Sequence, residues 1–141
     1  MRQILLFAAL ATSLALLSGC TLSKTKADTA EDMTGKAAYH KISAEEAYEM
    51  MASQEVVVVD VRTREEYDGG HIENAVLVPK GSIDEDTAAE VIPEKDSTVL
   101  VYCRSGRRSK DAAQKLLALG YQSVYDFGGV IDWPYELVKE G

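Results

Sequence analysis

The chain has 141 residues, of which 46% are hydrophobic and 27% are charged, a composition typical of one globular domain with a single core. Its 15 Lys and Arg face 23 Asp and Glu, which gives a net charge of −8 at pH 7. So large an acidic excess disfavours nucleic acid and anionic membrane surfaces as partners.

The first nineteen residues have the features of a targeting segment. Arg2 supplies a positive start, an apolar stretch runs from Ile4 to Leu17, and the segment ends in Leu17-Ser18-Gly19-Cys20. The stretch is too short for a comfortable membrane span. Its ending resembles the lipobox of bacterial lipoprotein signal peptides, which implies cleavage before Cys20 and lipidation of that cysteine. The alternative is an ordinary secretory leader in which Cys20 has no role.

The lipobox predicts an extracytoplasmic lipoprotein, held at a membrane of the bacterial cell envelope through Cys20. Residues 20–38 mix charged residues with Thr, Ser and Ala and show no apolar periodicity, a pattern typical of a flexible tether. The folded domain is therefore expected over residues 39–141, with signal peptide at 1–19 and tether at 20–38.

Three hydroxyl residues stand three positions before a glutamate, the spacing of a capping box at the start of a helix. The pairs are Ser43 with Glu46, Thr63 with Glu66, and Ser82 with Glu85. A fourth helix is predicted over residues 109–120, where Ala112, Ala113, Leu116 and Leu117 share one face and Gly120 provides a left-handed stop.

Short apolar runs rich in β-branched residues lie between these helices. They occupy residues 56–61, 75–79, 98–102 and 123–127, and they are too short for buried helices. Continuous apolar runs of this length are typical of parallel strands covered on both faces. The alternation predicts an α/β fold with a mostly parallel sheet.

Cys103 directly follows the predicted strand at 98–102, and it is the only thiol left if Cys20 is lipidated. Ligands of open α/β sheets bind beyond the carboxyl ends of the strands, where Asp60 should also emerge. Residues 103–108 then link strand to helix, and Gly106 permits a tight curve with inward-pointing amides. Together with the start of the next helix, these amides predict an anion cradle around the sulfur.

Three arginines, Arg104, Arg107 and Arg108, surround this thiol in the sequence. One guanidinium about 5 Å from the sulfur contributes roughly 3 kcal/mol at an effective dielectric near 20, far more than a distant surface carboxylate opposes. We therefore expect a thiolate-favouring environment suited to nucleophilic chemistry. The alternative is that Cys103 is a small buried hydrophobic residue at a strand end.

Three segments resemble, in order and spacing, those of rhodanese-like domains of the thiosulfate sulfurtransferase type. They are VVVVDVRTREEYDGGHIENAVLVP, VLVYCRSGRRS and GYQSVYDFGGVIDW, and the likeness covers residues 39–141. It implies a three-layer α/β sandwich with a five-stranded parallel sheet and helices on both faces. It also implies that Cys103 carries sulfane sulfur as a persulfide, cradled by a loop of Arg104, Ser105, Gly106, Arg107, Arg108 and Ser109.

That likeness implies transfer of sulfur from thiosulfate, or a similar small anionic donor, to cyanide or an external thiol, with no cofactor. Two other classes remain open. A tyrosine-phosphatase-like enzyme also places a cysteine in an anion cradle, but its arginine stands six positions later, whereas here that position is Ser109. A rhodanese-like binding or sulfur-carrier module is the other alternative.

Other polar residues receive supporting roles. Asp60 and Arg62 either orient the site or form a buried ion pair beneath the loop. Ser105 and Ser109 are expected to donate hydrogen bonds to the bound anion.

His71 is expected to be a structural turn residue, because too few ligands are available for a metal site. We expect a monomer without metal, whose acceptor thiol comes from outside.

Overall fold

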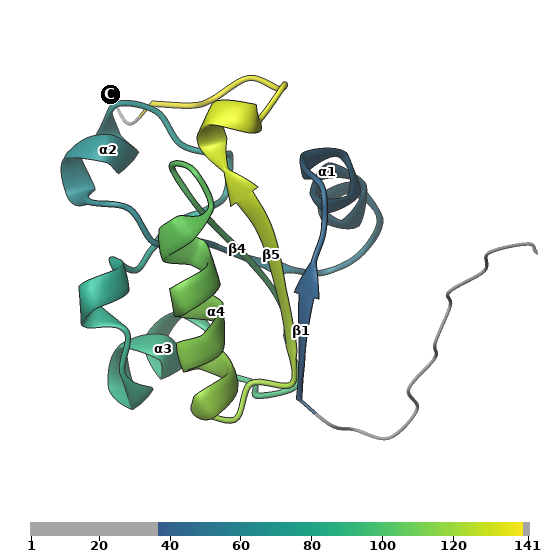
Figure 1. The fold of residues 1–141 in the computed structure, drawn as a ribbon, viewed down its shortest axis with the longest axis vertical. Coiled ribbons are helices and arrows are strands. Elements are labelled where there is room, and N and C mark those ends of the chain that lie inside the picture. Colours follow the sequence, from purple (N-terminus) through teal and green to yellow (C-terminus); the bar gives the residue numbers. More distant parts are fainter. Residues whose placement is uncertain (1–36, 140–141) are drawn as a thin grey trace, which may run out of the picture. The chain divides into compact units, whose positions relative to one another are not determined.

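The computed structural model describes residues 37–139, which alternate between strands and helices (Figure 1). The strands are β1 (Ala38–Lys41), β2 (Val57–Asp60), β3 (Val76–Leu77), β4 (Thr98–Cys103) and β5 (Ser123–Gly129). The helices are α1 (Ala44–Ser53), α2 (Arg64–Asp68), α3 (Glu85–Val91) and α4 (Arg107–Ala118), with 3-10 turns at Lys80–Ser82 and Val130–Asp132. The predicted leader, Cys20 and most of the predicted tether lie outside the described residues.

All five strands pair in parallel in the order β1-β5-β4-β2-β3, which confirms the predicted fold class. The four strands predicted from apolar runs are present, but β3 is shorter than the predicted 75–79. The Val78 amide still donates to the Asp60 carbonyl (2.9 Å) and the Lys80 amide to the Val61 carbonyl (3.1 Å), so backbone hydrogen bonds continue past the two residues of β3. β1 has no apolar run of its own, and its pairing with β5 forms the opposite edge.

Two of the predicted capping boxes form as expected. The Glu46 amide donates to Ser43 Oγ (3.1 Å) and the Ser43 amide to Glu46 Oε2 (2.7 Å), and Thr63 and Glu66 make the same reciprocal pair. The box predicted at Ser82 with Glu85 is wrong.

The third box joins Asp84 to Thr87 instead, so α3 begins at Glu85. Ser82 lies in the preceding 3-10 turn, where its carbonyl accepts a hydrogen bond from the Thr87 hydroxyl (2.5 Å). The Asp84 carboxylate, a strong acceptor, therefore sets the start of the helix.

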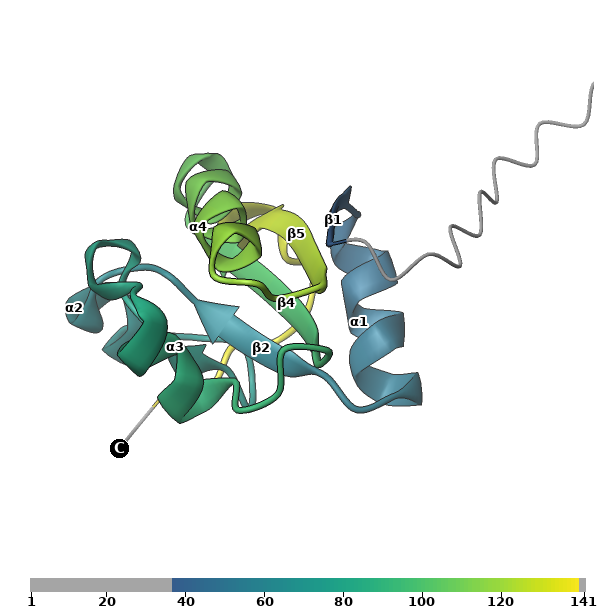
Figure 2. The same ribbon diagram turned by 90° about the horizontal axis from the view of Figure 1, so that it is seen from below.

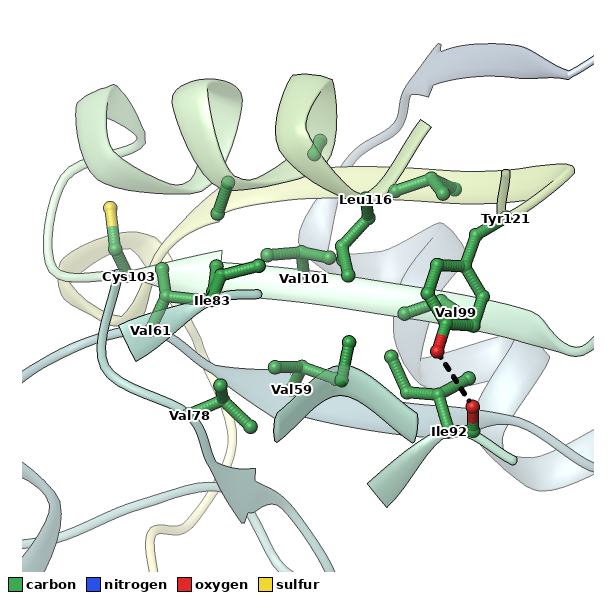
Figure 3. Close-up of a cluster of buried hydrophobic side chains, with 14 residues drawn as sticks. Val59, Val61, Val78, Ile83, Ile92, Val99, Val101, Cys103, Leu116 and Tyr121 are labelled. Carbon is green, nitrogen blue, oxygen red and sulfur yellow. Dashed lines mark hydrogen bonds between the residues drawn. The ribbon is translucent and has the colours of Figure 1, made fainter. Parts of the chain in front are cut away.

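Two apolar clusters cover the two faces of the sheet, with α3 and α4 on one side and α1 on the other (Figure 2). Because successive strand residues point to opposite faces, Val99, Val101 and Cys103 join the cluster under α4, while Leu100 and Tyr102 join the other. Figure 3 shows Cys103 at one end of the first cluster, and at the other end Tyr121 donates to the Ile92 carbonyl (2.8 Å). Within residues 37–139, no helix is long and apolar enough to cross a bilayer.

The pairing of β4 with β5 changes register just before the carboxyl edge. Val101 pairs with Asp126, but Cys103 pairs with Gly129, so β5 contains one extra residue there. Gly129 lies directly under the backbone of Arg104 and Ser105, where a Cβ atom would collide with the Arg104 carbonyl. This close approach sets how near the loop after Cys103 lies to the end of β5.

Gly129→Ala should lower the free energy of unfolding by about 2 kcal/mol, because the added methyl must push the Arg104 backbone aside. Gly81→Ala is the matched control, since a Cβ atom at Gly81 meets nothing within 4 Å. Urea unfolding of both variants measures the difference. Equal stabilities would show that the loop adjusts freely over β5.

Candidate active site

Cys103 ends β4, and its side chain is 1% exposed beneath the loop that leads into α4. The Gly106 amide donates to Cys103 Sγ at 3.0 Å, closing the loop over the sulfur. Gly106 has φ +93°, a left-handed conformation that strains any other residue. The helix starts at Arg107, earlier than the predicted Ser109, so the cradle combines three loop residues with the first turn of α4.

Burial raises the pKa of the Cys103 thiol, but hydrogen bonds outweigh it and leave the pKa below its usual value. The donors are the Ser109 amide and hydroxyl and the amides of Ser105 and Gly106. The direction of this shift agrees with the thiolate-favouring environment expected from the sequence. Hydrogen bonds from amides and from the Ser109 hydroxyl are its largest causes, as at other anion cradles, and Arg108 also interacts with Cys103 through its charge.

Arg108 is already engaged by a carboxylate. Its Nη1 and Nη2 donate to Glu66 Oε2 (2.7 Å) and Oε1 (2.8 Å), a bidentate ion pair between half-buried side chains. The hydrogen bond from Arg108 lowers the pKa of Glu66 to about 2. Arg104 and Arg107 are exposed. The site is consequently less basic than three adjacent arginines predict.

Asp60 and Arg62 form a buried ion pair at the end of β2. Arg62 Nη2 lies 2.6 Å from Asp60 Oδ2, and it also donates to the Gly70 carbonyl (2.8 Å). The hydroxyl of Tyr102 accepts from the Ile72 amide (3.1 Å), and burial together with Asp60 raises the pKa of Tyr102. These bonds tie the loop after α2 to the sheet edge next to Cys103.

Ser105 and Ser109 have different surroundings. Ser105 is exposed and, with Gly106, borders a groove of about 800 Å³ that also includes residues of β1 and α1. Ser109 is fully buried, and its hydroxyl lies 2.7 Å from Asp126 Oδ1. Asp126 itself is 1% exposed.

His71 is buried and packs its ring on Tyr67 with centroids 3.7 Å apart, while its backbone pairs with that of Val138. These contacts are those of a structural turn residue. Among residues 37–139, no group of three His, Cys, Asp or Glu side chains is placed to hold a metal ion.

Sequence reasoning missed Glu66 as a partner of Arg108 and Asp126 as a partner of Ser109. The sequence indicates only a capping role for Glu66, and its second contact spans 42 positions. Asp126 does have a local signal, since it is a charged residue inside the apolar run 123–127. A charge in a buried strand needs a partner, and such a requirement often marks a site.

Glu66→Gln should lower the free energy of unfolding at pH 7 by about 1 kcal/mol, because it removes one charge of a half-buried bidentate pair. The folded pKa of Glu66 lies below its usual value of 4.5, so the contribution is present above pH 4.5 and is lost as the pH falls toward about 2. Urea titrations between pH 7 and pH 3 should show the two proteins converging.

The control is Asp68→Asn, which breaks the exposed Arg64–Asp68 pair at 3.6 Å and should have little effect at any pH. A Glu66→Gln difference that does not depend on pH would contradict the ion-pair interpretation.

Comparison with known proteins supports the likeness drawn from the sequence. The family model of the rhodanese-like domain matches residues 43–134. Among solved structures, a rhodanese with anions from E. coli is 34% identical with a TM-score of 0.57, over 61% of this chain and all of that one. A rhodanese-like domain protein from Staphylococcus aureus is 30% identical with a TM-score of 0.59, over 72% of this chain and 99% of that one.

A relative named tRNA uridine(34) hydroxylase, from Photorhabdus laumondii, is 32% identical over 104 residues. The match covers 71% of this chain but 30% of that protein, and a Yersinia pestis protein of the same name is matched over the same share of its length. This chain thus spans less than a third of these relatives. By its match to the family model over most of the described residues, the chain belongs to the rhodanese-like domain family.

Proposed function

We propose that this domain is a sulfurtransferase that carries sulfane sulfur as a persulfide on Cys103. The observation that carries the proposal is the buried Cys103 sulfur, held at the focus of loop amides that lower the pKa of its thiol. A thiolate in such a cradle is a nucleophile, and a terminal sulfur added to it remains an anion that the same amides can bind. Arg104, Ser105, Gly106, Arg107, Arg108 and Ser109 are proposed as the binding loop.

The reaction consists of two displacements. The Cys103 thiolate attacks the outer sulfur of thiosulfate, the sulfur–sulfur bond of the donor breaks, and sulfite leaves with the bonding electron pair. A nucleophilic acceptor then attacks the outer sulfur of the persulfide, and the Cys103 thiolate leaves. No external oxidant or cofactor is required. Cys103 is the one free cysteine among the described residues, so the acceptor is cyanide in an assay and an external thiol or dithiol otherwise.

Two other activities are less well supported. A phosphoryl group needs a wider ring of donors, and Arg108 of this loop is held by Glu66. Hydroxylation of tRNA is named for relatives of which this chain spans 30%, and a net charge of −8 disfavours binding to RNA. We therefore propose a small anionic donor, no nucleic acid partner and a monomeric domain.

Intact-mass measurement of the full chain tests the proposal. Incubation with thiosulfate should add the mass of one sulfur atom, and cyanide should then remove it with formation of thiocyanate. Cys103→Ser should lose both steps while remaining folded, because its hydroxyl is nearly isosteric but does not ionise at neutral pH.

Hydrolysis of aryl phosphates by the unmodified chain should be negligible. A folded, reduced chain that cleaves them but never gains sulfur would support the phosphatase alternative. A chain that does neither would support a binding module.

We also propose that Cys20 is lipidated and holds the domain at the cell envelope. Metabolic labelling with a fatty acid should tag the protein, and Cys20→Ala should abolish the label. Cys103→Ser is the matched control and should keep it. Recovery of the unmodified protein without label and free of membranes would overturn the anchor.

A further inference from the structure

Asp126 is a buried carboxylate beside the proposed sulfur site, and the two-step transfer gives it no role. Its Oδ1 accepts from Ser109 Oγ (2.7 Å) and from the Gly128 amide (2.9 Å), and its Oδ2 accepts from the Tyr39 hydroxyl (2.8 Å). Lys41 Nζ lies 3.4 Å from Oδ1 and is half exposed. With four donors around it, the carboxylate has the surroundings of an ionised acceptor.

The Ser109 hydroxyl has one proton and more than one acceptor. Its oxygen lies 2.7 Å from Asp126 Oδ1, 3.0 Å from the Gly106 carbonyl and 3.3 Å from the Gly128 carbonyl. Gly106, whose carbonyl this hydroxyl contacts, donates its amide to Cys103 Sγ (3.0 Å), and the Ser109 hydroxyl is among the groups that lower the pKa of Cys103. A proton donated to the carboxylate is not available to the thiolate. Since charge-assisted O–H···O⁻ bonds are the shorter and stronger ones, the 2.7 Å contact favours Asp126.

We propose that Asp126 is a positioning residue that withholds the Ser109 proton from the Cys103 sulfur and so keeps the bound thiolate reactive. The idea rests on the proposed role of Cys103. The more the Ser109 proton is drawn to Asp126, the more the sulfur anion depends on the amides of the loop. A thiolate stabilised by one further donor would be a weaker nucleophile, because nucleophilicity falls as thiol pKa falls.

The surroundings define what else can affect the titration of Cys103. Tyr39 and Lys41 of β1 face Asp126, and burial followed by the bond to Asp126 raises the pKa of Tyr39 to about 12, so its phenol stays a donor at neutral pH. The charged groups on the elements around the loop include Arg108 with Glu66 and Arg62 with Asp60. Arg104 in the loop and Arg107 at the start of α4 are exposed, and Asp111 of α4 pairs with Lys80. Glu45, Lys110 and Asp132 line the groove that Asp126 borders.

The test is the rate of alkylation of Cys103 by iodoacetamide as a function of pH, measured in the full chain on the peptide that contains Cys103. Asp126→Asn should lower the apparent pKa of Cys103 by about one unit, because it removes a negative charge and frees the Ser109 proton. The rate of sulfur gain from thiosulfate above that pKa should then fall about threefold, as expected for a Brønsted slope near 0.45.

A double-mutant cycle separates the hydrogen bond from the charge. In a Ser109→Ala background, Asp126→Asn acts only through space, so its shift of the Cys103 pKa should be much smaller. Asp132→Asn, which removes another carboxylate of the same groove, is the control and should leave the profile unchanged. Equal shifts with and without the Ser109 hydroxyl, or no shift at all, would overturn the proposal.

Tyr39→Phe keeps the proposal testable if Asp126→Asn does not fold. Loss of the Tyr39 donor leaves Asp126 a stronger acceptor for the Ser109 proton, so the apparent pKa of Cys103 should rise. A fall would contradict the competition. Alkylation requires no sulfur donor, so failure of the chain to gain sulfur would defeat the proposed function alone and leave the pKa shifts as a separate result.

Discussion

The site depends on the close approach of β5 to the loop after Cys103. Gly129 passes under the Arg104 and Ser105 backbone with no room for a Cβ atom, and the extra residue in β5 sets this position. The loop held there turns at Gly106 and directs its amide at the sulfur (3.0 Å). The same extra residue lets the Gly128 amide reach back to Asp126 (2.9 Å), so one irregularity in the sheet organises both the sulfur and the carboxylate behind it.

Local sequence patterns were sufficient to predict most of the fold. Capping boxes at Ser43 and Thr63, apolar runs for β2, β4 and β5, and a cysteine at a strand end all express interactions between residues close in sequence. β1 was not visible because half of its short edge strand is exposed. The start of α3 was misplaced because Ser82 and Asp84 both fit an N-cap, and only the preceding 3-10 turn decides between them.

The sequence predicted that Cys103 follows a strand and that its surroundings favour the thiolate, but not which side chains contact one another around it. The sequence shows that three arginines follow Cys103, yet it does not show that Glu66, on another helix, binds Arg108. Nor does it show that the Ser109 side chain meets Asp126 rather than facing the sulfur alone. Contacts between residues far apart in sequence depend on how helices pack against the sheet, and a single sequence contains no direct signal for them.

Ion pairs between cations and the abundant acidic residues affect the charge around the Cys103 sulfur. Arg62, Arg108 and Lys41 each lie against a carboxylate, and hydrogen bonds from the loop and from Ser109 are the largest causes that lower the pKa of Cys103. Arg104 and Arg107 are exposed to solvent. Because nests of amides bind phosphate as well as smaller anions, the proposed preference for sulfur over phosphate rests on the small size of the loop and not on the charge balance around it.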